Sequence, residues 1–279
     1  MVPELPVLLG LAALIGACVG SFVNVVAWRL PRGESFIASR SHCPCCGSTL
    51  AWFELLPVVS FLLLGRRCGH CNQPISWRYP LVELLSAGLW AAMVVAHPPL
   101  PGGPSWLILG AGWLLVSWLL PLMLIDLDRL WLPEPLCRWG LVLGLLITLA
   151  VGLGQGSWQM RELLFDHLLA AAVGLLALEA LSGLGSLWLG RPALGLGDAK
   201  LAALLGAWLG LQALALTLAL AIVLGALVGS LARMMGRLGP LQPFPFGPFL
   251  GAAAVVIWLG GVDPWLALLA SLVPPGSVI

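Results

Sequence analysis

Long apolar runs recur along nearly the whole chain, and they decide what it can fold into. A helix needs about 20 residues to cross the hydrocarbon core of a bilayer, and eight apolar runs are candidates for such helices. They cover residues 4–28, 79–97, 105–125, 135–153, 163–188, 199–210, 212–235 and 247–272. Because only 9% of the residues are charged, the chain cannot form an apolar core beneath a polar surface. The sequence predicts an all-α polytopic membrane protein with about eight transmembrane helices.

The sixth run is short for a full crossing, and only Gly210, Leu211 and Gln212 separate it from the seventh. A break at these residues keeps the count at eight, whereas one continuous helix would lower it by one. Basic residues favour the break, because Lys and Arg in short loops are retained on the cytoplasmic side. With eight crossings, twelve of the thirteen basic residues fall on one side and only Arg161 falls on the other. This side is expected to be the cytoplasm.

Residues 31–78 form the one sizeable stretch outside the apolar runs, and they carry two C-x-x-C pairs. The pairs are Cys43 with Cys46 and Cys68 with Cys71. Each pair can place two thiolates on one side of a tetrahedral zinc ion, and four protein ligands would leave no position for water. The spacing predicts a small cytoplasmic zinc-ribbon-like insertion that holds a structural Zn²⁺. A pair of disulfides is the alternative, disfavoured in the reducing cytosol; Cys45 or His70 could also replace one of the four ligands.

Two acidic residues stand where apolar runs meet the same membrane boundary. Asp126 ends the third run, in 125-IDLDRLWLP, and Asp198 precedes the sixth, in 195-GLGDAK. Two carboxylates at one depth on different helices can share a proton, so that one acts as a base and the other as an acid. Peptide-bond hydrolysis by an aspartic dyad needs this pair, and Gly195 and Gly197 would allow a tight turn and close approach of another chain. Asp198 could instead cap a helix N-terminus, and Asp126 with Asp128 could mark a wetted helix end.

Several motifs together resemble those of bacterial type IV prepilin peptidases, which belong to the GxGD aspartyl proteases. In chain order they are 20-GSFVNVVAWRLPRG, the two C-x-x-C pairs, 54-ELLPVVSFLLLGRRC, 78-RYPLVE, 125-IDLDRLWLP, 195-GLGDAKL and 243-PFPFGPFL. The resemblance covers nearly the full length and implies that Asp126 and Asp198 are the catalytic residues. Asp128 matches an acidic position that is not usually assigned to catalysis. Glu134 departs from the family, which often has an aspartate after Leu-Pro, but keeps a carboxylate there.

The resemblance implies an enzyme of the bacterial cytoplasmic (inner) membrane that removes the short basic leader of type IV prepilins or pseudopilins. Its active site would face the cytoplasm. Many similar enzymes also methylate the new N-terminus with S-adenosylmethionine, an activity linked to the cytoplasmic region that includes the cysteines. The sequence has no glycine-rich fingerprint for this cofactor, so it places no binding site for it. We expect three parts: a first transmembrane helix (1–30), the insertion (31–78) and a membrane aspartyl protease domain (79–279).

Two other classes of protein compete with this interpretation. A secondary transporter would place its acidic residues near the bilayer midplane, whereas this pair is expected at one edge. A non-enzymatic membrane assembly scaffold would use the insertion for docking and would tolerate loss of either aspartate. The segment 242–249 contains three prolines and is expected to be an ordered re-entrant segment beside the substrate. Glu179, within the fifth run, suggests no particular function.

Overall fold

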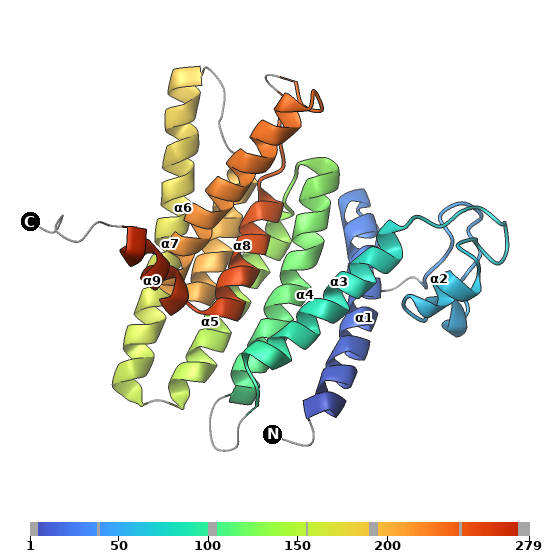
Figure 1. The fold of residues 1–279 in the computed structure, drawn as a ribbon, viewed down its shortest axis with the longest axis horizontal. Helices are drawn as coiled ribbons and strands as arrows, with labels where there is room; N and C mark the ends of the chain where they lie inside the picture. The colour runs from blue at the N-terminus through green and yellow to red at the C-terminus, as the bar shows by residue number, and fades with distance from the viewer. Residues whose placement is uncertain are drawn as a thin grey trace, which may run out of the picture. The chain divides into compact units, whose positions relative to one another are not determined.

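The computed structural model describes residues 5–37, 40–99, 105–154, 156–189, 195–239 and 242–272. These residues form helices and two isolated β-bridges, which confirms the prediction of an all-α protein (Figure 1). The chain divides into two compact units, Met1–Ile125 and Asp126–Ile279. The helix α4 (Ser105–Arg129) belongs mainly to the first unit, and its last turn, with Asp126, belongs to the second.

The first unit is built on two long helices that pack against each other, α1 (Leu5–Arg29) and α3 (Arg78–Ala96). Between them lie the short elements η1 (Leu30–Arg32), η2 (Trp52–Leu55) and α2 (Val59–Leu63). The two long helices approach closely at Gly20, where an added Cβ would lie 2.8 Å from the Cα of Glu83. Small residues at such crossings let helices pack tightly within a membrane. Trp90 of α3 stacks on Trp113 of α4, with ring centroids 4.9 Å apart.

The second unit surrounds one central element, α7 (Leu196–Met234), which packs against three other helices. These are α5 (Glu134–Leu153), α6 (Ser157–Leu189) and α8 (Gly247–Gly260). The last helix is α9 (Asp263–Leu272). The first half of α7 is almost wholly buried from Asp198 to Trp208, so its apolar residues form the core of this unit. Glu179 lies exposed on α6.

The helix α7 is broken at Gly210, whose φ of 76° and ψ of 175° are not helical. Its two halves fold back along α6, because a Cβ at Gly174 would meet both Ala202 O at 2.9 Å and Leu214 Cδ2 at 3.0 Å. In a straight helix these two residues would lie about 18 Å apart. The backbone N–H of Leu211 donates to Asp166 Oδ2 of α6 at 3.0 Å, which satisfies a donor freed by the break. The predicted break at Gly210–Gln212 is confirmed.

Six helices in the described part of the chain are long and apolar enough to cross a membrane, or seven if α8 and α9 form one span. This number counts α7 once, although its break at Gly210 divides it into the two expected runs 199–210 and 212–235. The expected span over 247–272 is divided into two helices. There the chain bends by 99° between α8 and α9, at Gly261, whose φ is 71°.

Replacing Gly210 by alanine should destabilise the protein, because the backbone conformation at this position is accessible almost only to glycine. We expect a loss of about 1–3 kcal/mol, increased by a clash between the new methyl group and Asp166. Gly229→Ala is the matched control, since Gly229 lies in the same element with open space around it. It should be neutral or stabilising. Thermal unfolding in detergent measures both variants, and equal midpoints would contradict the proposed strain.

Candidate active site and metal centre

Asp126 lies near the C-terminal end of α4, where the residue is only 5% exposed. Its Oδ2 accepts a hydrogen bond from the backbone N–H of Gly247, the first residue of α8, at 2.9 Å. The first N–H groups of a helix have no partner within that helix and carry the positive end of its dipole. The N-terminus of α8 therefore stabilises a negative charge on Asp126. Asp128 is exposed, so Asp126 is the buried carboxylate at this helix end.

Asp198 lies in the first turn of α7, and the residue is 8% exposed. Its Oδ2 accepts a hydrogen bond from the backbone N–H of Gly195 at 3.2 Å. The carboxylate thus caps its own helix, as one interpretation of the sequence expected. The cap also fixes the direction of the side chain, and a fixed carboxylate is what an acid or base in catalysis requires.

The structure brings Asp126 and Asp198 together from α4 and α7, close enough for their charges to interact. Both residues are buried, and two like charges held close in such surroundings do not ionise together at low cost. A single shared proton leaves one carboxylate able to accept a proton and the other able to donate one. The arrangement is therefore chemically suited to acid and base catalysis on one bound substrate.

Neighbouring residues hold the start of α7 in place. At Gly197, an added Cβ would lie 3.0 Å from the Cβ of Leu132, so this glycine allows Leu132 of the same chain to pack closely against the start of α7. Gly195 has a φ of −72°, which any residue adopts, so its backbone conformation does not require a glycine. Lys200 Nζ lies 2.9 Å from Glu134 Oε2, and this exposed ion pair joins the first turns of α7 and α5. An exposed pair of this kind contributes little to stability, because water and salt screen it.

Gly247 is the residue beside the aspartates whose contact the sequence did not predict. It lies 121 positions from Asp126, and an added Cβ would be 2.8 Å from Asp126 Oδ2. The only signal was its place in 243-PFPFGPFL, the segment expected near the substrate. Two phenylalanines of this segment, Phe244 and Phe249, stack with ring centroids 5.2 Å apart. The segment is thus ordered around the start of α8.

The four predicted metal ligands, Cys43, Cys46, Cys68 and Cys71, form a single cluster in the first unit. Their sulfur atoms all lie within 4.8 Å of one another, and Cys43 Sγ is 3.9 Å from Cys71 Sγ. Four thiolates around a tetrahedral ion with bonds of about 2.3 Å would be about 3.8 Å apart. The observed spacing fits such a centre, and all the cysteines are free thiols, not disulfides.

The two C-x-x-C pairs have the same local fold. In each, the residue that follows the second cysteine has a positive φ, 71° at Gly47 and 57° at Asn72. Its N–H donates to the carbonyl of the first cysteine, at 2.9 Å from Gly47 to Cys43 and 3.0 Å from Asn72 to Cys68. Glycine and asparagine tolerate this conformation best, which explains the sequences C-P-C-C-G and C-G-H-C-N.

Hydrogen bonds lower the pKa of two of these thiols, Cys46 and Cys68. Cys46 Sγ lies 3.4 Å from Ser48 Oγ, and this contact, with the backbone of Ser48, lowers the pKa of the Cys46 thiol to about 6. The backbone groups of Cys71 and His70 lower the pKa of Cys68. Because metals bind the thiolate form, these contacts favour metal binding.

The alternative ligands considered for this centre lie outside the cluster. Cys45 is exposed, and its sulfur is not among the four that come together. His70 instead faces Glu54, with 3.6 Å between His70 Nε2 and Glu54 Oε2. The geometry therefore favours the four predicted cysteines over a set that includes either residue.

The fold and these sites define a class: a polytopic helical membrane protein with two buried aspartates at helix ends and a separate four-cysteine centre. The chain belongs to the type IV leader peptidase family, which matches residues 113–230. Residues 14–97 match the bacterial peptidase A24 N-terminal domain. The two aspartates fall within the first range and the four cysteines within the second.

Several curated proteins named prepilin leader peptidase/N-methyltransferase are similar to this chain. The one from Myxococcus xanthus is 42% identical over 201 residues, which is 72% of this chain but only 56% of that protein. The one from Burkholderia pseudomallei (strain K96243) is 35% identical over 285 residues, covering 93% of this chain and 88% of that protein. The one from Stutzerimonas stutzeri is 37% identical over 274 residues, covering 90% of each. No solved structure matches the chain.

Proposed function

We propose that the chain is a membrane aspartyl endopeptidase that removes the short basic leader of type IV prepilins or pseudopilins, with Asp126 and Asp198 as its catalytic pair. The observation that carries this proposal is the meeting of these two buried carboxylates within the region that matches the type IV leader peptidase family. Both side chains are held by backbone N–H groups, from Gly247 and Gly195.

The chemistry follows from one proton shared by two carboxylates. The ionised aspartate takes a proton from a water molecule, which attacks the carbonyl carbon of the scissile peptide bond. The protonated aspartate donates a hydrogen bond to the carbonyl oxygen and stabilises the negative charge that develops there. The proton taken from water then passes to the leaving amine as the C–N bond breaks. The products are the free leader and a pilin with a new N-terminal amine.

A second activity, methylation of that new amine, is part of the proposal. It is supported by the names of the relatives, which are prepilin leader peptidase/N-methyltransferase. The methyl donor would be S-adenosylmethionine, which supplies an electrophilic methyl group when bound. This transfer needs neither a metal ion nor a change of oxidation state, so the four-cysteine centre would serve a structural role. Zn²⁺ is the ion that best suits four thiolates.

The chain is a multi-pass membrane protein, and we place its active site on the cytoplasmic side of the bacterial inner membrane. The distribution of Lys and Arg supports this orientation. Neither alternative class is favoured: a secondary transporter would keep its acidic residues at the bilayer midplane, and membership of a peptidase family argues against a non-enzymatic scaffold. Asp126 and Asp198 instead lie at helix ends.

The test is a product analysis with the purified protein in detergent. A prepilin that carries its leader is incubated with the protein, and the products are identified by mass. We expect loss of the leader, and the gain of one methyl group at the new N-terminus when S-adenosylmethionine is added. A methyl gain on uncut substrate would contradict the proposed order of steps. An intact substrate, with prepilins and pseudopilins alike, would overturn the peptidase function.

A further inference from the structure

One continuous segment of the insertion, residues 52–63, exposes apolar side chains, and we call it the apolar segment. Trp52 is 76% exposed, and Leu62 and Leu63 of α2 are 65% and 79% exposed. Four further apolar residues of the segment are also exposed: Phe53, Leu55, Leu56 and Val59. A contiguous apolar surface of this kind indicates a place that binds a membrane or another protein.

The length of α3 indicates how deep its residues lie in the bilayer. The helix has 19 residues and is a candidate membrane span. It is therefore about 28 Å long, close to the hydrocarbon thickness of about 30 Å, so each of its ends lies near one boundary. Its first residue, Arg78, lies at the boundary that we place on the cytoplasmic side. Glu83, five residues further along, lies about 7.5 Å below that boundary.

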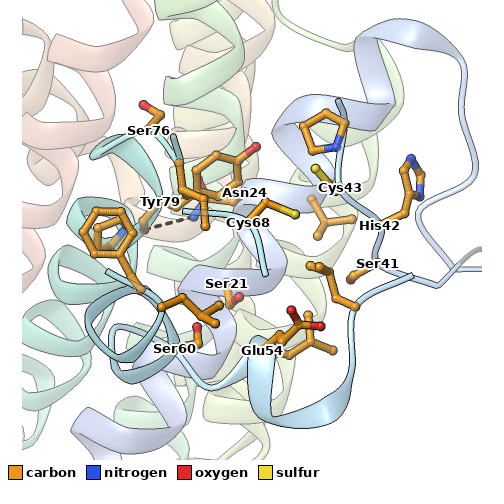
Figure 2. Close-up of a pocket in the computed structure, with 18 of the residues that line it drawn as sticks. Ser21, Asn24, Ser41, His42, Cys43, Glu54, Ser60, Cys68, Ser76 and Tyr79 are labelled. Carbon is orange, nitrogen blue, oxygen red and sulfur yellow. Dashed lines mark hydrogen bonds between the residues drawn. The ribbon is translucent and has the colours of Figure 1, made fainter. Parts of the chain in front are cut away.

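The apolar segment is joined to the membrane helices at this depth. The backbone N–H of Val58 donates a hydrogen bond to Glu83 Oε2 at 2.7 Å, and Glu83 is buried. Ser60 of α2 and Ser21 of α1 line one cavity (Figure 2). Because side chains on a helix lean toward its N-terminus, the bond to Val58 lies between the depth of the Glu83 Cα and the boundary. The start of α2 therefore lies at the border between headgroups and acyl chains, the depth typical of interfacial segments.

Basic and aromatic side chains lie where the insertion rejoins α3. Arg66 and Arg67 follow the apolar segment and are exposed. The guanidinium carbon of Arg66 lies 4.9 Å from the ring centroid of Trp77, an exposed residue that directly precedes α3. Tryptophan is enriched at the membrane boundary, and basic residues there attract anionic lipid headgroups. The surface thus presents apolar side chains below the boundary and positive charge at it, which complements a lipid leaflet.

We propose that the apolar segment is embedded in the cytoplasmic leaflet of the bilayer, with Trp52, Leu62 and Leu63 among the upper acyl chains. Lipid is the partner because both ends of the insertion continue into membrane helices, α1 and α3. The apolar surface also continues on the first turns of α3, where Leu81 and Leu84 are exposed. The insertion is thus held at the membrane by its own surface as well as by its two ends. This inference does not depend on the peptidase or the methyl transfer.

The test uses the unchanged full-length protein in vesicles of phosphatidylcholine and phosphatidylglycerol. The vesicles contain a trace of phospholipid with a photoactivatable diazirine on an upper carbon of its acyl chain. After irradiation and proteolysis, lipid adducts are located by mass. We expect adducts in residues 52–63 and none in residues 40–50, which include the first cysteine pair. Adducts in α1 and α3 without any in residues 52–63 would overturn the proposal. So would crosslinks between two copies of the chain through residues 52–63 in place of lipid adducts, because a second copy would then cover this surface.

The double variant Leu62→Ser and Leu63→Ser tests what holds the segment in the leaflet. Both side chains are exposed in the fold, so the unfolding temperature in detergent should not change. The yield of lipid adducts in residues 52–61 should fall at least about 10-fold, which corresponds to about 1.4 kcal/mol, because less apolar surface is removed from water. Ile37→Ser is the matched control, since Ile37 is an exposed apolar residue of the insertion outside the apolar segment. An unchanged yield in the double variant, or an equal fall in the control, would contradict the proposal.

Discussion

Replacing Asp126 or Asp198 by asparagine should reduce the rate of leader removal by about 10³-fold, within the range for loss of a general acid or base. Asparagine keeps the shape of the side chain and can still accept a hydrogen bond through its carbonyl oxygen, from Gly247 in one case and Gly195 in the other. It cannot take or give the proton. The initial rate of leader removal, followed by mass, measures the effect at saturating prepilin.

Asp128→Asn is the control that separates a catalytic role from a general need for charge at this helix end. Asp128 lies two positions from Asp126 but is exposed, so its variant should cut at close to the normal rate. The double variant Asp126→Asn and Asp198→Asn should be no worse than either single variant, because the pair acts as one unit. Leader removal that survives in both single variants would exclude the dyad. If the rate of leader removal falls as much in Asp128→Asn as in Asp126→Asn, the catalytic role proposed for Asp126 is wrong.

Replacing Cys68 by alanine should remove the bound metal and unfold the insertion. Cys68 is buried in the four-sulfur cluster, and its loss leaves three ligands around the ion. Structural zinc centres contribute about 10–16 kcal/mol of folding free energy in small zinc-dependent peptides, so a short segment built on one does not stay folded without it. Metal content after purification and the rate of proteolysis within residues 40–78 are the measurements.

Cys45→Ala is the matched control, since Cys45 adjoins the ligand Cys46 but is exposed and outside the cluster. It should keep the metal and resist the protease as the unchanged protein does. If Cys45→Ala loses the metal and Cys68→Ala keeps it, then Cys45 is a ligand and Cys68 is not. A chelator strong enough to remove the metal should reproduce the proteolysis of Cys68→Ala without any substitution.

The sequence predicted best those features that are encoded over a few neighbouring residues. The two cysteine pairs form one cluster because each C-x-x-C turn is local and ends at a residue that tolerates a positive φ, Gly47 or Asn72. The break in α7 was also predicted, because Gly210 interrupts an apolar run otherwise rich in helix-forming residues. The burial of Asp126 beside the exposed Asp128 is also local, because residues two apart on a helix face different directions.

Several features that depend on distant parts of the chain were not predicted. The hydrogen bond from Gly247 to Asp126 joins residues 121 positions apart, and no apolar periodicity encodes such a pairing. The bend between α8 and α9 was missed because 247–272 is apolar throughout, and composition alone does not distinguish a bent pair from a straight span. A cavity in the first unit was also not predicted, because residues of three separate segments line it, from α1, the insertion and the start of α3.

The bond between Asp126 and α8 has a consequence for how this protein tolerates mutation. Its donor is a main-chain N–H, which every amino acid except proline supplies, so almost no single codon change at position 247 can delete the donor itself. A larger residue there would instead clash with Asp126, because its Cβ would lie too close to the carboxylate. A substitution at position 247 therefore acts by displacing Asp126. A second substitution that makes room at this contact should restore activity.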